Sequence, residues 1–371
     1  TYAGAVEACA STGGALMPPV MGAVAFIMAE FLNVSYATVV VAALVPAFLF
    51  YLALVLQADN YAARNGLKGQ PPEEIPRLWD VVKSGWYYIF SLATLIYMLI
   101  GLRIESHAPY YATAVLLISS VVFGGRNRIT MHGFVEMLLD AVKNIVSIIG
   151  ILVGIGMIVG SLAYTGVGPA FSGELLQFAG ENTFLLLLLG AATSFILGMG
   201  MTVSACYIFL AIVMGQAVAD AGINLIAGHL FILYWGMMSY ITPPVAVAAV
   251  AAATVAGSHP MRTGVMSMRL GGILFILPFL FVFNPTLILH GDTIDILHDV
   301  LTACLAVWLL ASALEGWLYW VGRIEWTNFR IPALLAAAAL LYPGYLSDLV
   351  GLGIVAAMLL LGKTVIKKAE A

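Results

Sequence analysis

One stretch decides how this chain folds: Ala10-Ser-Thr-Gly-Gly-Ala-Leu-Met-Pro-Pro-Val-Met-Gly22. It lies inside an apolar run from Thr1 to Phe31, in which only Glu7 and Glu30 are charged. A run of this length matches one crossing of a lipid bilayer. Two glycines and two prolines stand near its middle, and they favour an interruption of the helix rather than a regular crossing.

The prolines of this stretch predict a helix break near the middle of the bilayer. Pro18 and Pro19 have no backbone N–H to donate, and each pushes the residue before it away from the α region. Broken backbone at this depth is tolerated only where protein buries it or water reaches it. The freed backbone groups and nearby hydroxyls are therefore candidate contacts for an ion or a polar solute. These candidates are Ser11, Thr12, Gly13 and Gly14.

A second break follows in the later half of the chain, within Met238-Ser-Tyr-Ile-Thr-Pro-Pro-Val-Ala-Val-Ala248. A shift of 225 residues places its Pro243 and Pro244 on the prolines of the first break. Paired interruptions at corresponding positions of two halves are the best sequence indication of a secondary transporter's binding site. Ser239 and Thr242 are the candidate contacts here. The alternative is that both breaks are kinks with no role in transport.

The composition predicts a polytopic membrane protein. Of the 371 residues, 62% are hydrophobic and 9% are charged, whereas a soluble domain carries roughly 25% charged residues. Cys9, Cys206 and Cys304 lie in apolar runs without metal-site spacing, so we expect them to be packing residues. The sequence opens inside a crossing segment, and we therefore expect that an N-terminal part is missing.

Segment 183–219 carries no charge and is too long for one crossing. Because Gly198-Met-Gly-Met-Thr-Val-Ser204 interrupts it, we expect a re-entrant hairpin with its tip at mid-membrane. The candidate contacts at this tip are Gly198, Gly200, Thr202 and Ser204.

A second broken crossing is expected at 226–257, after the hairpin. Further crossings are expected at 35–57, 86–102, 109–123, 145–165, 264–289 and 296–321, with shorter segments at 331–342 and 346–362. Segments 59–84 and 166–182 are expected to be loops, and 132–143 an amphipathic stretch that lies at the interface or joins the scaffold.

The positions of the lysines and arginines test this assignment of crossings, because cytoplasmic loops carry an excess of these residues. With 59–84 in the cytoplasm and 183–219 returning to its own side, only Arg103 among the 15 falls outside the cytoplasm. If 183–219 were a full crossing, every later loop would lie on the opposite side of the membrane. The same parse makes the two broken crossings antiparallel, which predicts an all-α, inverted-repeat, ion-transporter-like fold.

Four regions follow from this parse. We expect 1–57 to end the first transport repeat, 58–165 to form a connecting loop and scaffold-type spans, 166–290 to form the second transport repeat, and 291–371 to be a C-terminal membrane extension.

Several motifs share the pattern of one known family. They are 4–23, Leu197-Gly-Met-Gly-Met201, Ser239-Tyr-Ile-Thr-Pro-Pro-Val245, Ala256-Gly-Ser-His-Pro-Met-Arg-Thr-Gly264, and 278–287, which ends Phe-Asn-Pro-Thr-Leu. On these residues the chain resembles the large permease subunit of TRAP transporters (tripartite ATP-independent periplasmic transporters). Within this family it is most similar to the fused permeases that work with TAXI-type solute-binding proteins. The tail from about residue 294 resembles the extension that some fused permeases carry.

The resemblance implies a multi-pass protein of the bacterial inner membrane that imports a small organic acid or amino acid with sodium as the coupling ion. A periplasmic solute-binding protein would deliver the solute. A small membrane subunit, fused upstream or separate, would complete the transporter, and the transport domain would move as an elevator. The resemblance implies no cofactor besides sodium, and no nucleic-acid partner. Many members read Pro-Thr-Thr where this chain has Thr202-Val-Ser204, so the hydroxyls remain but the proline is absent.

Sodium is a hard cation that prefers oxygen ligands, and the tips and breaks supply uncharged ones. The sodium candidates among the residues above are Ser11, Gly13, Gly198, Gly200 and Thr242. The alternative is that these small residues only allow helices to pack closely. Glu7 lies at the cytoplasmic end or inside the membrane, and His229 is a packing residue or a proton relay.

Two other functions compete with this interpretation. An intramembrane enzyme would need a paired-Asp or Ser/His arrangement within its spans, but no Gly-x-Ser-x-Gly occurs and most of the aspartates lie in loops. We therefore expect no enzyme activity. The second alternative is another inverted-repeat anion transporter that works without a binding protein. The sequence does not identify the solute.

Overall fold

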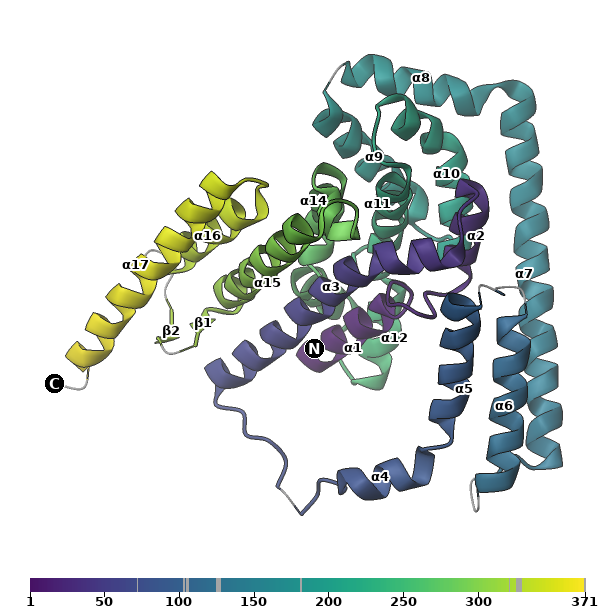
Figure 1. The fold of residues 1–371 in the computed structure, drawn as a ribbon, viewed down its shortest axis with the longest axis horizontal. Helices are drawn as coiled ribbons and strands as arrows, with labels where there is room; N and C mark the ends of the chain where they lie inside the picture. The colour runs from purple at the N-terminus through teal and green to yellow at the C-terminus, as the bar shows by residue number, and fades with distance from the viewer. Residues whose placement is uncertain are drawn as a thin grey trace. The chain divides into compact units, whose positions relative to one another are not determined.

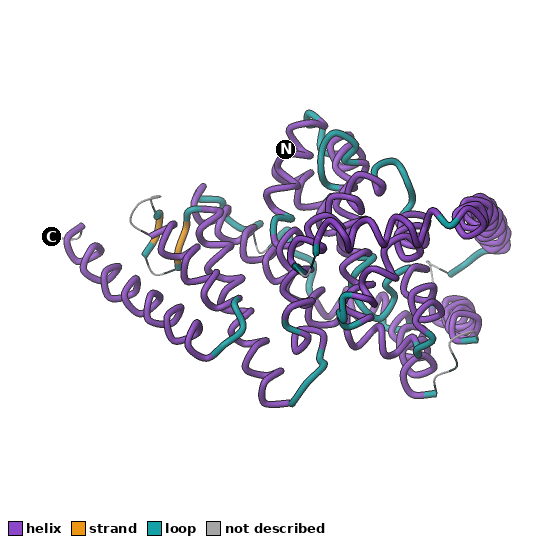
Figure 2. Tube along the Cα trace, turned by 90° about the horizontal axis from the view of Figure 1, so that it is seen from above, coloured by secondary structure: helices purple, strands orange, loops and turns teal. Residues whose placement is uncertain are grey.

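The computed structural model describes residues 1–71, 73–102, 104, 107–124, 128–180, 182–319, 321–324 and 329–369. These residues are almost entirely helical, which confirms the predicted all-α fold class (Figure 2). Within them, the strands are β1 (Trp317–Leu318) and β2 (Gly322–Arg323), which form one short antiparallel hairpin. Arg103, the exception in the charge pattern, lies outside the described residues.

Several helices are long and apolar enough to cross a membrane, which confirms a polytopic membrane protein. In the described part of the chain they are Tyr36–Asn65, Val203–Asp220, Pro260–Phe283 and Thr293–Glu315. A fifth span results if Leu78–Gly85 and Tyr88–Gly101, which are bent by 69° relative to each other, are taken as one crossing.

The chain divides into two compact units. The first contains residues 1–28, 40–68 and 166–371, and the second contains 29–39 and 69–165. Both broken segments and the 183–219 hairpin belong in large part to the first unit. The assignment of transport and scaffold roles to these regions stays a prediction.

The first crossing is interrupted where the prolines predict it. Helix α1 (Tyr2–Gly13) ends just before the Pro-Pro pair, and α2 (Ala23–Leu32) begins after it. Helix α3 (Tyr36–Asn65) follows, and it continues eight residues beyond the predicted end at 57 (65 minus 57). The second crossing is interrupted in the same way, between α11 (Leu225–Met237) with its 3₁₀ turn Met238–Tyr240 and α12 (Val247–Val255).

The backbones of the two breaks agree at several corresponding residues. Both Pro-Pro peptide bonds are cis, and Met21 and Ala246, which correspond under the 225-residue shift, both have a φ of 41°. The N–H of Met21 donates to the carbonyl of Met17 at 3.3 Å. Under the same shift, the N–H of Ala246 donates to the carbonyl of Thr242 at 3.1 Å. The internal repeat therefore extends from the sequence to the local conformation.

The uncharged segment 183–219 forms two helices, α9 (Thr183–Gly198) and α10 (Val203–Asp220), joined by a short turn. Side-chain oxygens of Asn182 and Thr202 cap the two helices by accepting N–H groups of their first turns, at 3.0 and 3.3 Å. Both helices pack against α11 (Figure 1). By length and composition α10 could cross a membrane alone, so the re-entrant depth stays a prediction.

Two expected loops and one expected boundary are wrong. Segment 166–182 contains a helix, α8 (Val167–Ala179), which packs on α10 through a hydrogen bond from Ser172 Oγ to the carbonyl of Val213. The expected loop 59–84 contains the end of α3 and a short helix, α4 (Leu78–Gly85). The amphipathic stretch 132–143 and the crossing 145–165 are parts of one helix, α7 (Met131–Thr165), because no proline separates them.

The remaining helices follow the predicted order. In the second unit they are α5 (Tyr88–Ile96), the π-helical turn Tyr97–Gly101 and α6 (Ala108–Phe123). After the second break they are α13 (Pro260–Leu270), α14 (Ile273–Phe283), the 3₁₀ turn Pro285–Ile288, α15 (Thr293–Glu315), α16 (Ile331–Leu341) and α17 (Tyr345–Ala369). Helix α16 packs on both α15 and α17 through buried alanines and leucines, which include Ala306, Ala313, Ala333 and Leu340.

The charge pattern makes a testable prediction about the second crossing. A cysteine replacing Ala221, before α11, should react from the periplasm with a membrane-impermeant maleimide. A cysteine replacing the exposed His259, after α12, should react only from the cytoplasm. Labelling of intact and inverted vesicles measures both, with the wild-type chain as the control for its native cysteines. Reaction of both positions from the same side would contradict the broken crossing.

Candidate functional site

The tip of the α9–α10 hairpin is hydrogen-bonded directly to the second break. The hydroxyl of Ser239 donates to the carbonyls of Gly198, at 2.9 Å, and Gly236, at 3.2 Å. The hydroxyl of Tyr240 donates to the carbonyl of Met201 at 3.0 Å. The carbonyls that the hairpin frees at its tip therefore lie beside the backbone that the prolines interrupt.

Close backbone contact between these segments depends on glycine. A Cβ atom added to Gly198 would lie 2.5 Å from the carbonyl oxygen of Gly236, and one added to Gly236 would lie 2.8 Å from Cys206 Sγ. Gly200 is required for another reason, because its φ of 86° is a left-handed conformation that glycine adopts most readily. The small residues of the tip thus allow the hairpin and the break to meet.

Thr242 carries a feature that points to a ligand. The residue is 7% exposed, and its Oγ1 is buried without a hydrogen-bond partner among the described residues. Proline at the next position holds Thr242 away from the α region, so its hydroxyl cannot bond to a regular helix carbonyl. A buried hydroxyl without a partner costs about 1–3 kcal/mol, and a bound cation or polar solute would supply that partner.

The hydroxyls of the first break are differently arranged. Thr12 Oγ1 donates to the carbonyl of Ala8 at 2.7 Å, within its own helix. Ser11 Oγ donates to the carboxylate of Glu7 at 2.8 Å, and both side chains are exposed. The structure therefore brings Gly198 and Ser239 together near Thr242, and it leaves Ser11 and Thr12 with partners of their own.

One glycine of the first break, Gly13, lies against helix α3. A Cβ atom on Gly13 would overlap the ring of Phe50, and the hydroxyl of Tyr51 donates to the carbonyl of Ala10 at 2.8 Å. Gly14 continues the helical conformation of α1 as its C-terminal cap. Close packing, the alternative considered for these glycines, thus accounts for Gly13.

The other candidates have defined roles at the hairpin. Thr202 caps α10, as described above, and Ser204 follows it in the first turn of that helix, partly exposed. His229 is buried on α11, and its Nδ1 lies 2.6 Å from the hydroxyl of Tyr207 on α10. This pair joins the hairpin to α11.

Two tyrosines that fix the site were not selected from the sequence. Tyr240 ties the second break to the hairpin tip, and Tyr51 ties α3 to the first break. Tyr240 could have been found, because it lies inside the Ser-Tyr-Ile-Thr-Pro-Pro motif. Tyr51 could not, because an aromatic residue within an apolar helix carries no distinguishing pattern.

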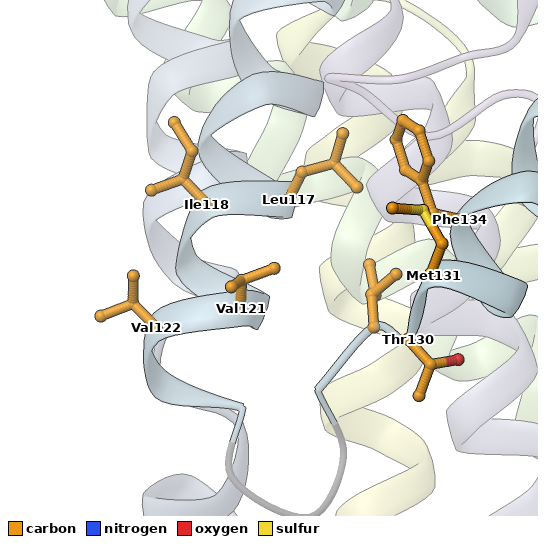
Figure 3. A pocket seen from close by; sticks show the side chains of 8 residues that line it. Leu117, Ile118, Val121, Val122, Thr130, Met131 and Phe134 are labelled. Atoms are coloured by element: carbon orange, nitrogen blue, oxygen red, sulfur yellow. The ribbon is translucent and has the colours of Figure 1, made fainter.

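A separate pocket does not contain any predicted site residue. It has a volume of about 450 Å³ and is formed by α6 and the start of α7 (Figure 3). Leu117, Val121, Met131 and Phe134 line it together with other mostly apolar side chains. Exposed apolar surface of this kind suits contact with lipid tails, and we do not assign the transport site to it.

Comparison with known protein families finds a match over most of the chain. Residues 1–293 match the family model described as "Tripartite ATP-independent periplasmic transporter, DctM component". No curated protein matches the chain significantly. The match covers both Pro-Pro breaks, the hairpin and helices α13 and α14, and it ends where α15 begins.

The matched family also defines the class of function. DctM proteins are transporters rather than enzymes, and they are integral components of the inner membrane. They work with a periplasmic binding protein and a small membrane subunit. Since the match extends over most of the sequence, this chain belongs to the DctM family, the large permease component of tripartite ATP-independent periplasmic transporters.

Proposed function

We propose that the chain imports a small organic acid or amino acid, driven by an inward sodium gradient. The observation that carries this proposal is the buried hydroxyl of Thr242 within the second break, which has no hydrogen-bond partner in the described part of the chain. It lies in a region whose candidate ligands are all uncharged oxygens, the ligand type that suits a hard monovalent cation. No Asp or Glu occurs from 183 to 219 to carry a proton instead.

The helix starts around the site supply an attraction for an anionic solute. Helix α10 begins directly after the hairpin tip, and α12 begins directly after the second break. The N-terminus of a helix carries partial positive charge and unbonded N–H groups, which favour a carboxylate. Transporters with broken helices use such half-helix termini to bind anionic groups. A carboxylate solute is therefore the substrate class that we favour.

An elevator movement agrees with how the hairpin is fixed. Ser239 and Tyr240 tie the tip to the second break, and the pair Tyr207–His229 ties α10 to α11. With these contacts the hairpin and the broken crossing would move as one body. We further propose that a TAXI-type binding protein delivers the solute, on the strength of the motif resemblance.

Reconstitution in proteoliposomes tests the coupling ion. With the cognate binding protein present, uptake of the solute should require an inward sodium gradient, because the candidate ligands suit sodium and provide no proton relay. Radiolabelled solute measures uptake under imposed sodium or proton gradients. Equal uptake from a proton gradient without sodium would refute sodium coupling.

Omitting the binding protein from the same vesicles tests the alternative of an anion transporter that works alone. The proposal expects uptake to fall to the background of empty vesicles. Full uptake without the binding protein would favour the alternative.

A further inference from the structure

The last three helices, α15, α16 and α17, pack around a core of their own and are called the extension below. The buried side chains of this core include Ala306, Ala333, Leu340 and Met358. The family match ends at residue 293, where α15 begins, so the extension lies almost entirely outside it. Helices with their own core can form a separate anchor in the membrane, or they can be a fixed part of the unit that contains both Pro-Pro breaks. The contacts of α15 distinguish between these arrangements.

The C-terminal end of α15 is joined to α13 and α3 by polar contacts. Glu315 is 0% exposed, and its Oε2 lies 3.0 Å from Nη2 of Arg269 on α13. Arg64 on α3 donates from Nη1 to the carbonyl of Glu315 at 2.9 Å. Nearby, Nδ2 of Asn60 on α3 lies 3.5 Å from Oγ of Ser312, and both residues are buried. Moving α15 along α13 would take a buried carboxylate away from its arginine, which is costly.

The N-terminal part of α15 is joined to the turn that follows α14, which belongs to the matched segment. Oδ2 of Asp299 accepts a hydrogen bond from Nδ2 of Asn284 at 2.9 Å and lies 2.6 Å from the hydroxyl of Thr286. The other oxygen of Asp299, Oδ1, lies 2.9 Å from Nδ1 of His298. The Nε2 atom of His298 lies 3.4 Å from Oδ2 of Asp348 on α17. The polar contacts therefore continue from the matched segment through α15 to α17.

The two sets of contacts are far apart along α15. Asp299 and Glu315 are separated by 16 residues (315 minus 299), which is about 24 Å of helix at 1.5 Å per residue. Contacts at one end alone would still allow α15 to swing about that end, whereas contacts at both ends oppose swinging, rotation and sliding. Both ends of α15 belong to the compact unit that contains the hairpin and large parts of both broken crossings.

We propose, on the basis of the import function given above, that the extension is a fixed part of this unit and moves with the Pro-Pro breaks as one rigid body during transport. The contacts of α15 with α3, α13 and the turn after α14 then stay intact in every state of the transport cycle. The extension is thus not a stationary anchor past which the breaks move.

Disulfide cross-linking of the full chain in membranes tests this proposal. Asn60→Cys combined with Ser312→Cys puts two thiols where the present side chains lie 3.5 Å apart. We expect copper phenanthroline to cross-link most of the protein, to the same extent with and without sodium and solute. Peptide mass spectrometry measures the yield. In proteoliposomes with the binding protein, the cross-linked protein should import solute at the same rate as the same variant after reduction.

Matched variants control the experiment. Asp59→Cys with Ser312→Cys should cross-link poorly, because Asp59 is next to Asn60 on α3 but is exposed. Each single cysteine variant controls for pairing with the native cysteines. If the first pair does not fold, Thr286→Cys with Asp299→Cys tests the opposite end of α15, where the side-chain oxygens are 2.6 Å apart.

Three results would overturn the proposal: a yield no higher than that of the control pair, a yield that changes with sodium or solute, or uptake that is lost on oxidation and restored by reduction. Failure of sodium coupling is a separate result, because it appears as sodium-independent uptake by the wild type. The yields with and without solute still decide the proposal in that case.

Discussion

Replacing Thr242 by valine is expected to raise the sodium concentration needed for half-maximal uptake by about 5- to 150-fold, the equivalent of losing about 1–3 kcal/mol of polar interaction. Valine keeps the shape of threonine but removes the one buried hydroxyl of the second break that has no protein partner among the described residues. Sodium-dependent uptake of the solute into proteoliposomes measures the change.

The same substitution should not destabilise the protein. An unpartnered buried hydroxyl costs stability, so its replacement by a methyl group is expected to leave the melting temperature equal or higher. This outcome separates a role in ligand binding from a role in folding. Thr242→Ser keeps the oxygen and should retain most activity.

Thr254→Val provides the matched control for Thr242→Val, because the hydroxyl of Thr254 on α12 is exposed and donates to the carbonyl of Val250. It should leave the sodium requirement unchanged. If Thr242→Val is well expressed and has the sodium dependence of the wild type, the second break is only a structural kink.

Replacing Gly198 by alanine is expected to abolish most transport and to lower stability by about 1–3 kcal/mol, the usual cost of inserting a methyl group into a well-packed site. The added Cβ would lie 2.5 Å from the carbonyl oxygen of Gly236, a backbone atom that cannot move like a flexible side chain. The hairpin tip would have to separate from the break, which would stretch the hydrogen bond from Ser239 to the Gly198 carbonyl. Thermal unfolding and uptake together measure both effects.

Gly173→Ala is the control for Gly198→Ala. Gly173 lies on α8 in the same unit, and no described atom outside the neighbouring backbone of its own helix lies within 4 Å of its added Cβ, so alanine should fit and should favour the helix. We expect wild-type uptake with equal or slightly higher stability. If Gly198→Ala has the same unfolding temperature and the same uptake as the wild type, the close contact between hairpin and break is not required.

Much of the framework could be predicted from local chemistry. Proline removes a donor and restricts its neighbour wherever it occurs, so Pro18 and Pro243 place the breaks without knowledge of the fold. Glycines that interrupt an uncharged run likewise place the turn between α9 and α10. Thr12 could also have been judged locally, because a helical threonine readily bonds to the carbonyl four residues earlier.

The remainder depends on contacts between distant segments. The sequence of 166–182 contains glycines and a proline and suggests a loop, but packing against α10 makes most of it helical. The contact of Gly198 with Gly236, and that of Arg64 with Glu315, join residues far apart in the chain. No local pattern identifies such pairs, because they form only when the helices pack.

Measuring ²²Na⁺ entry together with solute entry tests the central claim most directly. Proteoliposomes that contain the chain, its small membrane subunit and the binding protein are given ²²Na⁺ outside. The account predicts that ²²Na⁺ accumulates only when the solute and the binding protein are both present, and that Thr242→Val loses this accumulation at sodium concentrations that saturate the wild type. Solute import at the wild-type rate with no accompanying ²²Na⁺ entry would contradict it.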